Sequence, residues 1–150
     1  NQISDVFKSA GMAMMSSMGG ASGALFGTLF MNGGKALDGE ETLNSDGLKS
    51  FLNAANEGVK SRGGASPGDK TMIDALEPAA KEASENITLP LYELISLVSQ
   101  AADRGKEESK DMIATMGRAK TLGERSLGHP DAGACSVAII LKSMSEFINQ

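Results

Sequence analysis

The feature that most constrains this fold is an apolar spacing that repeats along the whole chain. Aliphatic and aromatic residues recur at i, i+3, i+4 and i+7, which places them on one face of an α-helix. Sustained alternation with period two, typical of half-buried strands, is missing from the sequence. We therefore predict an all-α fold, a bundle or barrel of antiparallel amphipathic helices joined by short connections. The segments with the helical spacing are residues 3–17, 25–30, 48–62, 72–83, 91–102 and 137–148.

Capping residues predict where the first four helices begin and end. We expect the first helix to end at about Ser17 and the third near Arg62. Ser22 is the expected N-cap of the second helix and Asp69 of the fourth, because these side chains can accept a bond from an unpaired backbone N–H. Asn44, Ser45 and Asp46 are the expected cap and first-turn residues of the third helix.

Two later segments contain residues that disfavour a helix interior. Pro78 should kink the fourth helix, since proline removes one backbone bond and crowds the preceding turn. Thr88 and Pro90 mark the expected start of the fifth helix, Gly105 is a candidate break, and Ile113 and Met116 could extend its apolar stripe.

Size and composition exclude several classes of function. A chain of 150 residues suits one domain, and its net charge of -5 argues against a broad nucleic-acid-binding face. One cysteine and no signal-peptide pattern indicate a cytoplasmic protein without disulfides. No apolar run approaches the roughly 20 residues that cross a bilayer, so we expect no membrane contact. The nine methionines are interpreted as adaptable core residues.

Three glycine-rich loops precede predicted helices: "SSMGGASG", "SRGGASPGDKT" and "GRAKTLGERSLGHPDAGA". A helix N-terminus offers unpaired N–H groups and a positive dipole end, and glycine lets an anion approach the backbone. In an antiparallel bundle these helix starts could gather at one end, with Arg118 or Arg125 beside a bound phosphate. Ordinary turns explain the same spacing, so both interpretations stay open here.

Two familiar nucleotide motifs do not fit. The phosphate-binding P-loop requires G-x-x-x-x-G-K-[ST] after a strand, whereas Asp69 separates Gly68 from Lys70 and a helix precedes the loop. The dinucleotide fingerprint G-x-G-x-x-G fails at "GGASG" in both spacing and context.

Other candidates for chemistry are isolated. His129 has no second histidine or cysteine at metal-ligand spacing, so a structural or helix-capping role is favoured over a base or ligand. Cys135 starts an apolar helix, where a thiol can be activated, but a buried inert cysteine is favoured. The acidic groups at 38–41 and 103–108 are interpreted as solvated faces. The long connection over 117–133 predicts a functional or disordered loop.

Taken together and in this order, "GGASGALFGTLF", "SRGGASPGDKTMIDAL" and "GRAKTLGERSLGHPDAGA" resemble the nucleotide-binding L subunit of dihydroxyacetone kinase and its fused equivalents. The resemblance extends from about Gly11 to the last helix. It implies a barrel of eight antiparallel helices, about six of them within these 150 residues, that binds ADP or ATP and magnesium at one end. It also implies phosphoryl transfer to dihydroxyacetone held by a separate K subunit or domain.

The resemblance assigns roles to individual positions. Two residues should meet the phosphates, two should line the base pocket, and one arginine, the candidate catalytic residue, should face phosphate charge. Three more should close on the nucleotide, which makes the 117–133 loop a nucleotide lid. In that order the implied residues are Ala21 and Ser22, Gly63 and Met72, Arg118, and Asp131, Ala132 and Gly133. Ala132 stands where bacterial L subunits often have proline, and His129 is a plain loop residue.

The family's metal motif, an aspartate followed by Gly-Asp-x-Asp-His-Gly, does not occur in this sequence. We therefore assign no metal ligand and expect the magnesium ligands in an N-terminal segment that is absent, through truncation, proteolysis or disorder, with the first two helices. Because metal ions neutralise and position the transferred phosphate, the chain as given is expected to be a poor catalyst.

Three functions remain under this resemblance. The leading hypothesis is the phosphotransferase-coupled kinase, in which bound ADP is recharged by a phosphocarrier M subunit, the K subunit presents dihydroxyacetone, and the L subunit forms a homodimer. An alternative is the C-terminal nucleotide domain of an ATP-dependent dihydroxyacetone kinase, which an upstream K domain would favour. The other is a non-catalytic nucleotide-binding regulatory module, against which intact metal-binding aspartates would count.

Overall fold

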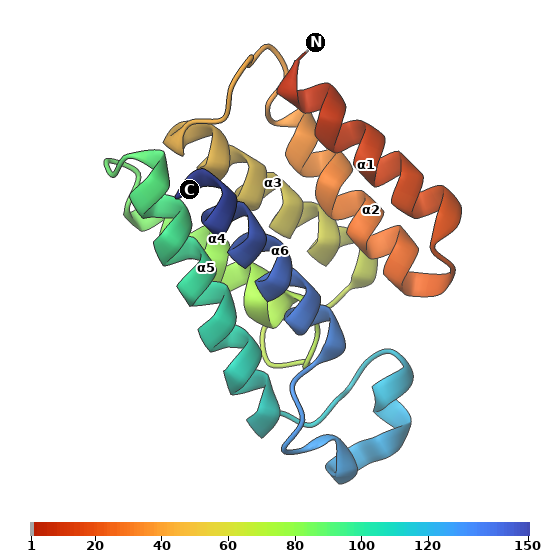
Figure 1. The fold of residues 1–150 in the computed structure, drawn as a ribbon. Helices are drawn as coiled ribbons and strands as arrows, with labels where there is room; N and C mark the ends of the chain where they lie inside the picture. Colours follow the sequence, from red (N-terminus) through yellow and green to blue (C-terminus); the bar gives the residue numbers. More distant parts are fainter. Residues whose placement is uncertain (1) are drawn as a thin grey trace.

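The computed structural model describes residues 2–150 as a bundle of helices without strands (Figure 1). Its elements, in chain order, are α1 (Ile3–Ser17), α2 (Gly20–Lys35), α3 (Ser45–Gly63), α4 (Ile73–Glu85), α5 (Leu91–Glu108), the 3-10 segments η1 (Ser109–Asp111) and η2 (Arg118–Ser126), and α6 (Ala132–Ile148). The prediction of an all-α fold with about six helices is confirmed within this part of the chain.

Each α-helix packs against the next one along the chain, and α6 also packs against α4. Most connections are short turns, so neighbouring helices run in opposite directions (Figure 1). The antiparallel arrangement places the starts of α2, α4 and α6 at the same end of the bundle, where η2 also lies (Figure 1).

The core is aliphatic, with one aromatic cluster. Leu48, Ile73 and Leu94 are fully buried, and each stabilises the fold by about 1.5–3 kcal/mol relative to an exposed side chain. The centroids of the Phe7 and Phe51 rings lie 4.7 Å apart, and this aromatic contact joins α1 to α3.

The methionines are less buried than the composition suggested. Met72 alone among them belongs to the buried core, whereas Met12 and Met18 are 60% and 41% exposed. Met14, Met116 and Met144 are partly buried against the core. The interpretation of all nine as core residues is therefore wrong for Met12 and Met18, because α1 packs mainly on α2 and leaves much of its surface open.

Several helix boundaries agree with the capping residues. α1 ends at Ser17, and α3 ends one residue after Arg62. The Asn44 side chain accepts a 2.8 Å hydrogen bond from the Gly47 N–H, which makes it the N-cap of α3, and Ser45 and Asp46 lie in the first turn, so the predicted group of cap and first-turn residues is confirmed.

Two predicted N-caps are wrong. α2 begins at Gly20 with Gly19 in the cap position, so Ser22 lies inside the first turn. α4 begins at Ile73, because Lys70 adopts a left-handed backbone conformation, with φ of 61°, that a right-handed helix cannot include. The Asp69 carboxylate instead accepts a 2.8 Å bond from the Ser66 N–H within the preceding turn. Pro78 lies inside α4, which continues to Glu85.

The fifth helix also differs from its prediction. Gly105 does not break α5, which runs through it to Glu108, and the glycine is buried against α4. Ile113 and Met116 do not extend α5, because the chain turns into η1 and then leaves the helix direction. The connection to α6 is not without structure either, since its middle forms η2.

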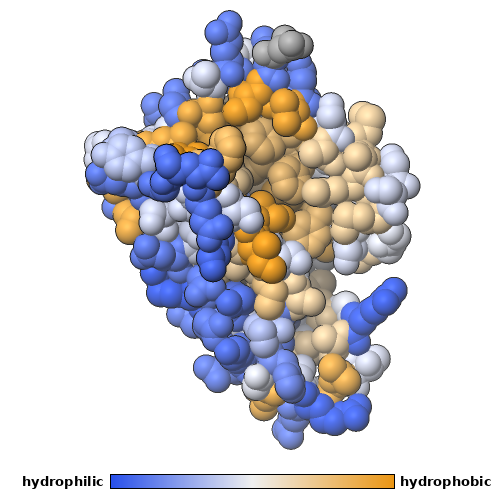
Figure 2. Space-filling view, in the orientation of Figure 1, coloured by the Kyte–Doolittle hydropathy of each residue, from blue (hydrophilic) through white to orange (hydrophobic). Residues whose placement is uncertain are grey.

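One face of the bundle keeps apolar side chains at its surface. Figure 2 shows them gathered over the middle of the view, where Figure 1 places α6. On α6, Ile139 and Phe147 are exposed, while Ile140 and Met144 are half-buried against the core. None of the helices within residues 2–150 is long and apolar enough to span a bilayer.

Candidate functional site

A cavity of about 940 Å³ opens at the end of the bundle where α2, α4 and α6 begin. This volume is at the upper end of the range of small-molecule sites, about 300–1,000 Å³. Every residue to which the sequence assigned a binding role lines this one cavity: Ala21, Ser22, Gly63, Met72, Arg118, Asp131, Ala132 and Gly133. The fold thus brings together three loops that are separated by up to about 110 positions in the sequence.

The polar part of the cavity is built from helix starts. Ala21 and Ser22 lie in the first turn of α2, and Ala132 and Gly133 in the first turn of α6. Backbone N–H groups in a first turn have no partner within the helix, and the helix dipole adds positive potential there. Two helix starts on one cavity therefore favour an anionic ligand such as a phosphate group.

A tight turn precedes α4 and supplies another wall. The buried Asp74 carboxylate accepts hydrogen bonds from the backbone N–H groups of Gly68, at 2.7 Å, and Thr71, at 2.8 Å. Met72, at the end of this turn, is 4% exposed and lines the cavity. Since Asp74 is occupied by these two bonds, its role is to hold the turn in place.

The cavity wall contains both apolar and cationic side chains. Leu25, Phe26 and Val59 form an apolar surface with Met72, which suits a flat aromatic group. The cationic lining residues are Arg62, Lys70, Arg118 and Arg125. A cavity with an apolar wall, several cations and open helix starts can hold a molecule that is aromatic at one end and anionic at the other.

Asp131 is the N-cap of α6 and the acidic group of the cavity lining. Its carboxylate accepts a 2.9 Å bond from the Ala134 N–H. Burial raises the pKa of Asp131 above its ordinary value of 3.8, and the charge of Asp74 raises it further. Hydrogen bonds from the Ala134 and Gly133 backbones and the charge of Lys70 oppose this rise.

This raised pKa predicts how stability depends on pH. The native carboxyl binds its proton more tightly than the unfolded chain does, so the free energy of unfolding falls as pH rises from about 3.8 through the native pKa. Asp131→Asn keeps the cap and removes the charge, so the free energy of unfolding should fall less over this pH range in the variant. Urea unfolding between about pH 3 and pH 7 measures it. The exposed Asp111→Asn is the control, and an unchanged pH dependence in Asp131→Asn would assign the effect to another group.

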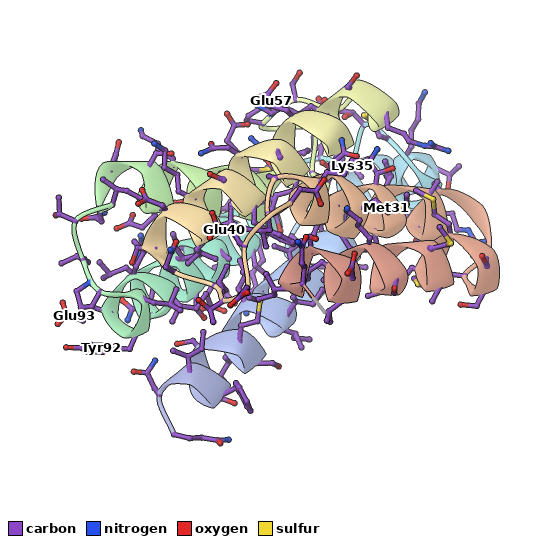
Figure 3. The ribbon with its side chains drawn as sticks, turned by 90° about the horizontal axis from the view of Figure 1, so that it is seen from above. Met31, Lys35, Glu40, Glu57, Tyr92 and Glu93 are labelled. Carbon is purple, nitrogen blue, oxygen red and sulfur yellow. The ribbon has the colours of Figure 1, made fainter. Side chains whose placement is uncertain are left out.

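The structure also places the histidine, the cysteine and the acidic residues that the sequence raised as candidates for chemistry. His129 is exposed at the cavity, and Asp131 rather than His129 caps α6. Cys135 is half-buried in the first turn of α6 and does not line the cavity. Of the acidic residues labelled in Figure 3, Glu40 belongs to the acidic group at 38–41, and it lies apart from Glu57 and Glu93.

Sequence reasoning missed many of the lining residues, among them Leu25, Arg62 and Lys70. Leu25 was interpreted only as part of an apolar stripe, Arg62 only as a helix end, and Lys70 only as part of a failed P-loop. For Lys70 a signal was present, because a lysine next to glycine and aspartate in a helix-preceding loop is typical of anion sites. For Leu25 and Arg62 the helical spacing gave no sign of a cavity.

Magnesium does not fit the residues described. Within 2–150, no group of three or more histidine, cysteine, aspartate or glutamate side chains gathers to hold a metal ion. Asp131, which lines the cavity, and Asp74, which holds the turn before α4, already accept backbone N–H groups.

Residues 1–146, nearly the whole chain, match the DAK2 domain. The chain belongs to the DAK2 domain family. It is 42% identical over 142 residues to the ADP-binding subunit DhaL of PEP-dependent dihydroxyacetone kinase 1 of Listeria innocua, covering 95% of this chain and 67% of that protein. It is 37% identical over 147 residues to the corresponding Escherichia coli subunit, covering 95% and 69%.

The same domain is similar to part of longer kinases. Human triokinase/FMN cyclase is 31% identical over 137 residues, which cover 90% of this DAK2 chain but 24% of the human protein. The likeness therefore extends over most of the free-standing subunits and over about a quarter of the human enzyme.

Proposed function

We propose that this DAK2 chain is the ADP-binding subunit of a PEP-dependent dihydroxyacetone kinase. The observation that carries the proposal is the cavity of about 940 Å³, on which two helix starts, three arginines and an apolar wall converge. The names of its bacterial relatives support the same ligand, since both are ADP-binding subunits.

Different lining residues would bind the two ends of ADP. Met72 and the apolar wall beside Gly63 would take the adenine ring, and the first turns of α2 and α6 would donate N–H groups to phosphate oxygens. Arg118 and Arg125 lie on η2, where their charges can face the phosphates. When bound, ADP serves as the carrier of the phosphoryl group that reaches dihydroxyacetone.

The wider assembly is part of the proposal. A K subunit would present dihydroxyacetone, a phosphocarrier M subunit would recharge ADP, and the chain would form a homodimer in the cytoplasm. Magnesium belongs to this proposal only through the family resemblance, because the described residues offer it no cluster of ligands. Arg118 is proposed as the catalytic residue, acting on phosphate charge.

Calorimetric titration with ADP, with AMP as competitor and with or without magnesium, tests the binding function. We expect one ADP per chain and weaker binding of AMP, since AMP leaves one phosphate position at the helix starts unfilled. Production of dihydroxyacetone phosphate after addition of K subunit, phosphocarrier and phosphoenolpyruvate tests the transfer. A chain shown to be folded by circular dichroism that binds no ADP would refute the proposal.

A further inference from the structure

Lys70 is a buried cation that the proposed binding scheme does not use. Its residue is only 4% exposed, and it lies in the turn between α3 and α4. Among residues 2–150 it is the sole non-glycine residue with a positive φ, 61°. Strained backbone of this kind persists only where the surroundings enforce it, and here the Asp74 carboxylate holds the N–H groups on both sides, at Gly68 and Thr71.

The Lys70 ammonium joins two points that are far apart along the chain. It donates to the Met112 carbonyl oxygen at 3.1 Å and to the Ser126 carbonyl oxygen. These two residues flank residues 113–125, which we call the lid segment. One side chain on a different element thus bridges both ends of the lid segment.

Other hydrogen bonds also join the two ends of the lid segment, residues 110–114 and 126–128, which we call its neck. The Gly128 N–H donates to the Lys110 carbonyl at 2.7 Å, and the Ala114 N–H donates to the Ser126 hydroxyl at 2.9 Å. The Thr115 hydroxyl donates to the Asp69 carbonyl at 3.0 Å, next to Lys70 in the chain. The turn that carries Lys70 is therefore hydrogen-bonded to both ends of the lid segment.

The lid segment contributes Met116, Arg118, Leu122 and Arg125 to the cavity lining. It has little core of its own, since Ala114 is its one buried residue. Its position over the cavity therefore depends on the polar bonds at its neck, of which those from a buried ammonium are the strongest kind.

We propose that Lys70 is a positioning residue that holds the lid segment, and with it Arg118, over the bound ADP. The inference rests on the proposed ADP site for its ligand. Lys70 acts through the Met112 and Ser126 carbonyls, and its loss should let the neck open and ADP escape faster while the helical bundle stays folded.

Lys70→Met, which keeps an unbranched side chain one atom shorter and removes its charge and donors, tests this. Amide hydrogen exchange of residues 113–125 is measured without nucleotide, and dissociation of a fluorescent N-methylanthraniloyl ADP is measured by stopped flow. We expect faster exchange confined to the lid segment and its neck and a dissociation rate raised roughly tenfold or more, with association changed much less. Lys70→Arg, which keeps charge and donors, should stay closer to the wild type than Lys70→Met.

The matched control is Lys120→Met, which removes the same charge from an exposed lysine of the lid segment that does not line the cavity. It should leave exchange and dissociation unchanged. A folded Lys70→Met protein with a lower melting temperature but wild-type exchange in residues 113–125 would overturn the inference, because Lys70 would then stabilise the core alone. Should Lys70→Met not fold, Lys70→Gln, whose amide can donate to one carbonyl, decides by the same two measurements.

The two proposals can fail separately. Wild-type protein that binds no ADP would refute the proposed function and the ADP part of this inference. Exchange of the lid segment in the nucleotide-free variants still decides whether Lys70 holds the neck.

Discussion

Replacing Gly105 with alanine is expected to lower the free energy of unfolding by about 3 kcal/mol, a large part of the stability of a small domain. A Cβ at this position would lie 2.0 Å from the Asp74 carbonyl oxygen and 3.1 Å from the Ala75 Cα. Both are backbone atoms of α4, so no side chain can rotate away. The helices would have to separate, and this would uncover the core that they share.

The sequence explains why α5 approaches α4 so closely at this point. Pro78 has no N–H, so it cannot donate the bond that the Asp74 carbonyl four residues earlier would otherwise accept. Without a side chain, Gly105 allows the α5 backbone to cover that carbonyl. Asp74 also holds the turn before α4, so Gly105→Ala should disturb the cavity wall as well.

Urea or thermal unfolding measures the effect, with Gly58→Ala as the matched control. A Cβ at Gly58, in the middle of α3, would meet the Asn32 side chain, nearest at its Nδ2 atom at 2.1 Å, and that side chain can move aside. Alanine also favours a helix over glycine by about 1 kcal/mol. Gly58→Ala should therefore cost much less, and equal stability of the two variants would contradict the close helix contact.

The second large effect is expected for Arg118→Ala, which should raise the dissociation constant for ADP about tenfold or more. Arg118 begins η2 and lines the cavity, but it is exposed, so its contribution arises in the complex rather than in the folding of the free chain. A guanidinium can donate two parallel bonds to a phosphate. Calorimetric titration should therefore show the loss for ADP and a smaller one for AMP.

Arg104→Ala is the control for this variant. Arg104 is an exposed arginine of α5 that pairs with Glu82 at 3.7 Å and does not line the cavity. The two variants carry the same net charge, so a difference between them reports the position of Arg118. Equal ADP affinities of the two variants would mean that the effect comes from net charge alone. Wild-type ADP affinity in Arg118→Ala would mean that Arg118 does not contribute to the site.

Much of the site could be predicted because its residues lie in short local patterns. The glycine-rich stretches at 16–23, 61–71 and 117–134 lie before or at helix starts, and all eight residues that the family resemblance singled out line one cavity. Their individual roles toward ADP stay predictions. Helix boundaries were predicted less accurately. Asp69 has a typical capping side chain, but the left-handed backbone of Lys70 after it means that α4 begins only at Ile73.

The sequence by itself determined the helical class, most helix ends and the loops that can hold an anion, because apolar periodicity and capping depend on residues within a few positions of one another. Only the tertiary structure decided that Gly105 is a helix contact rather than a break, and that Lys70 bridges Met112 and Ser126. These contacts join residues about 30 to 56 positions apart. Local propensity carries no information about such pairs, since they depend on how the helices pack and where each backbone leaves room.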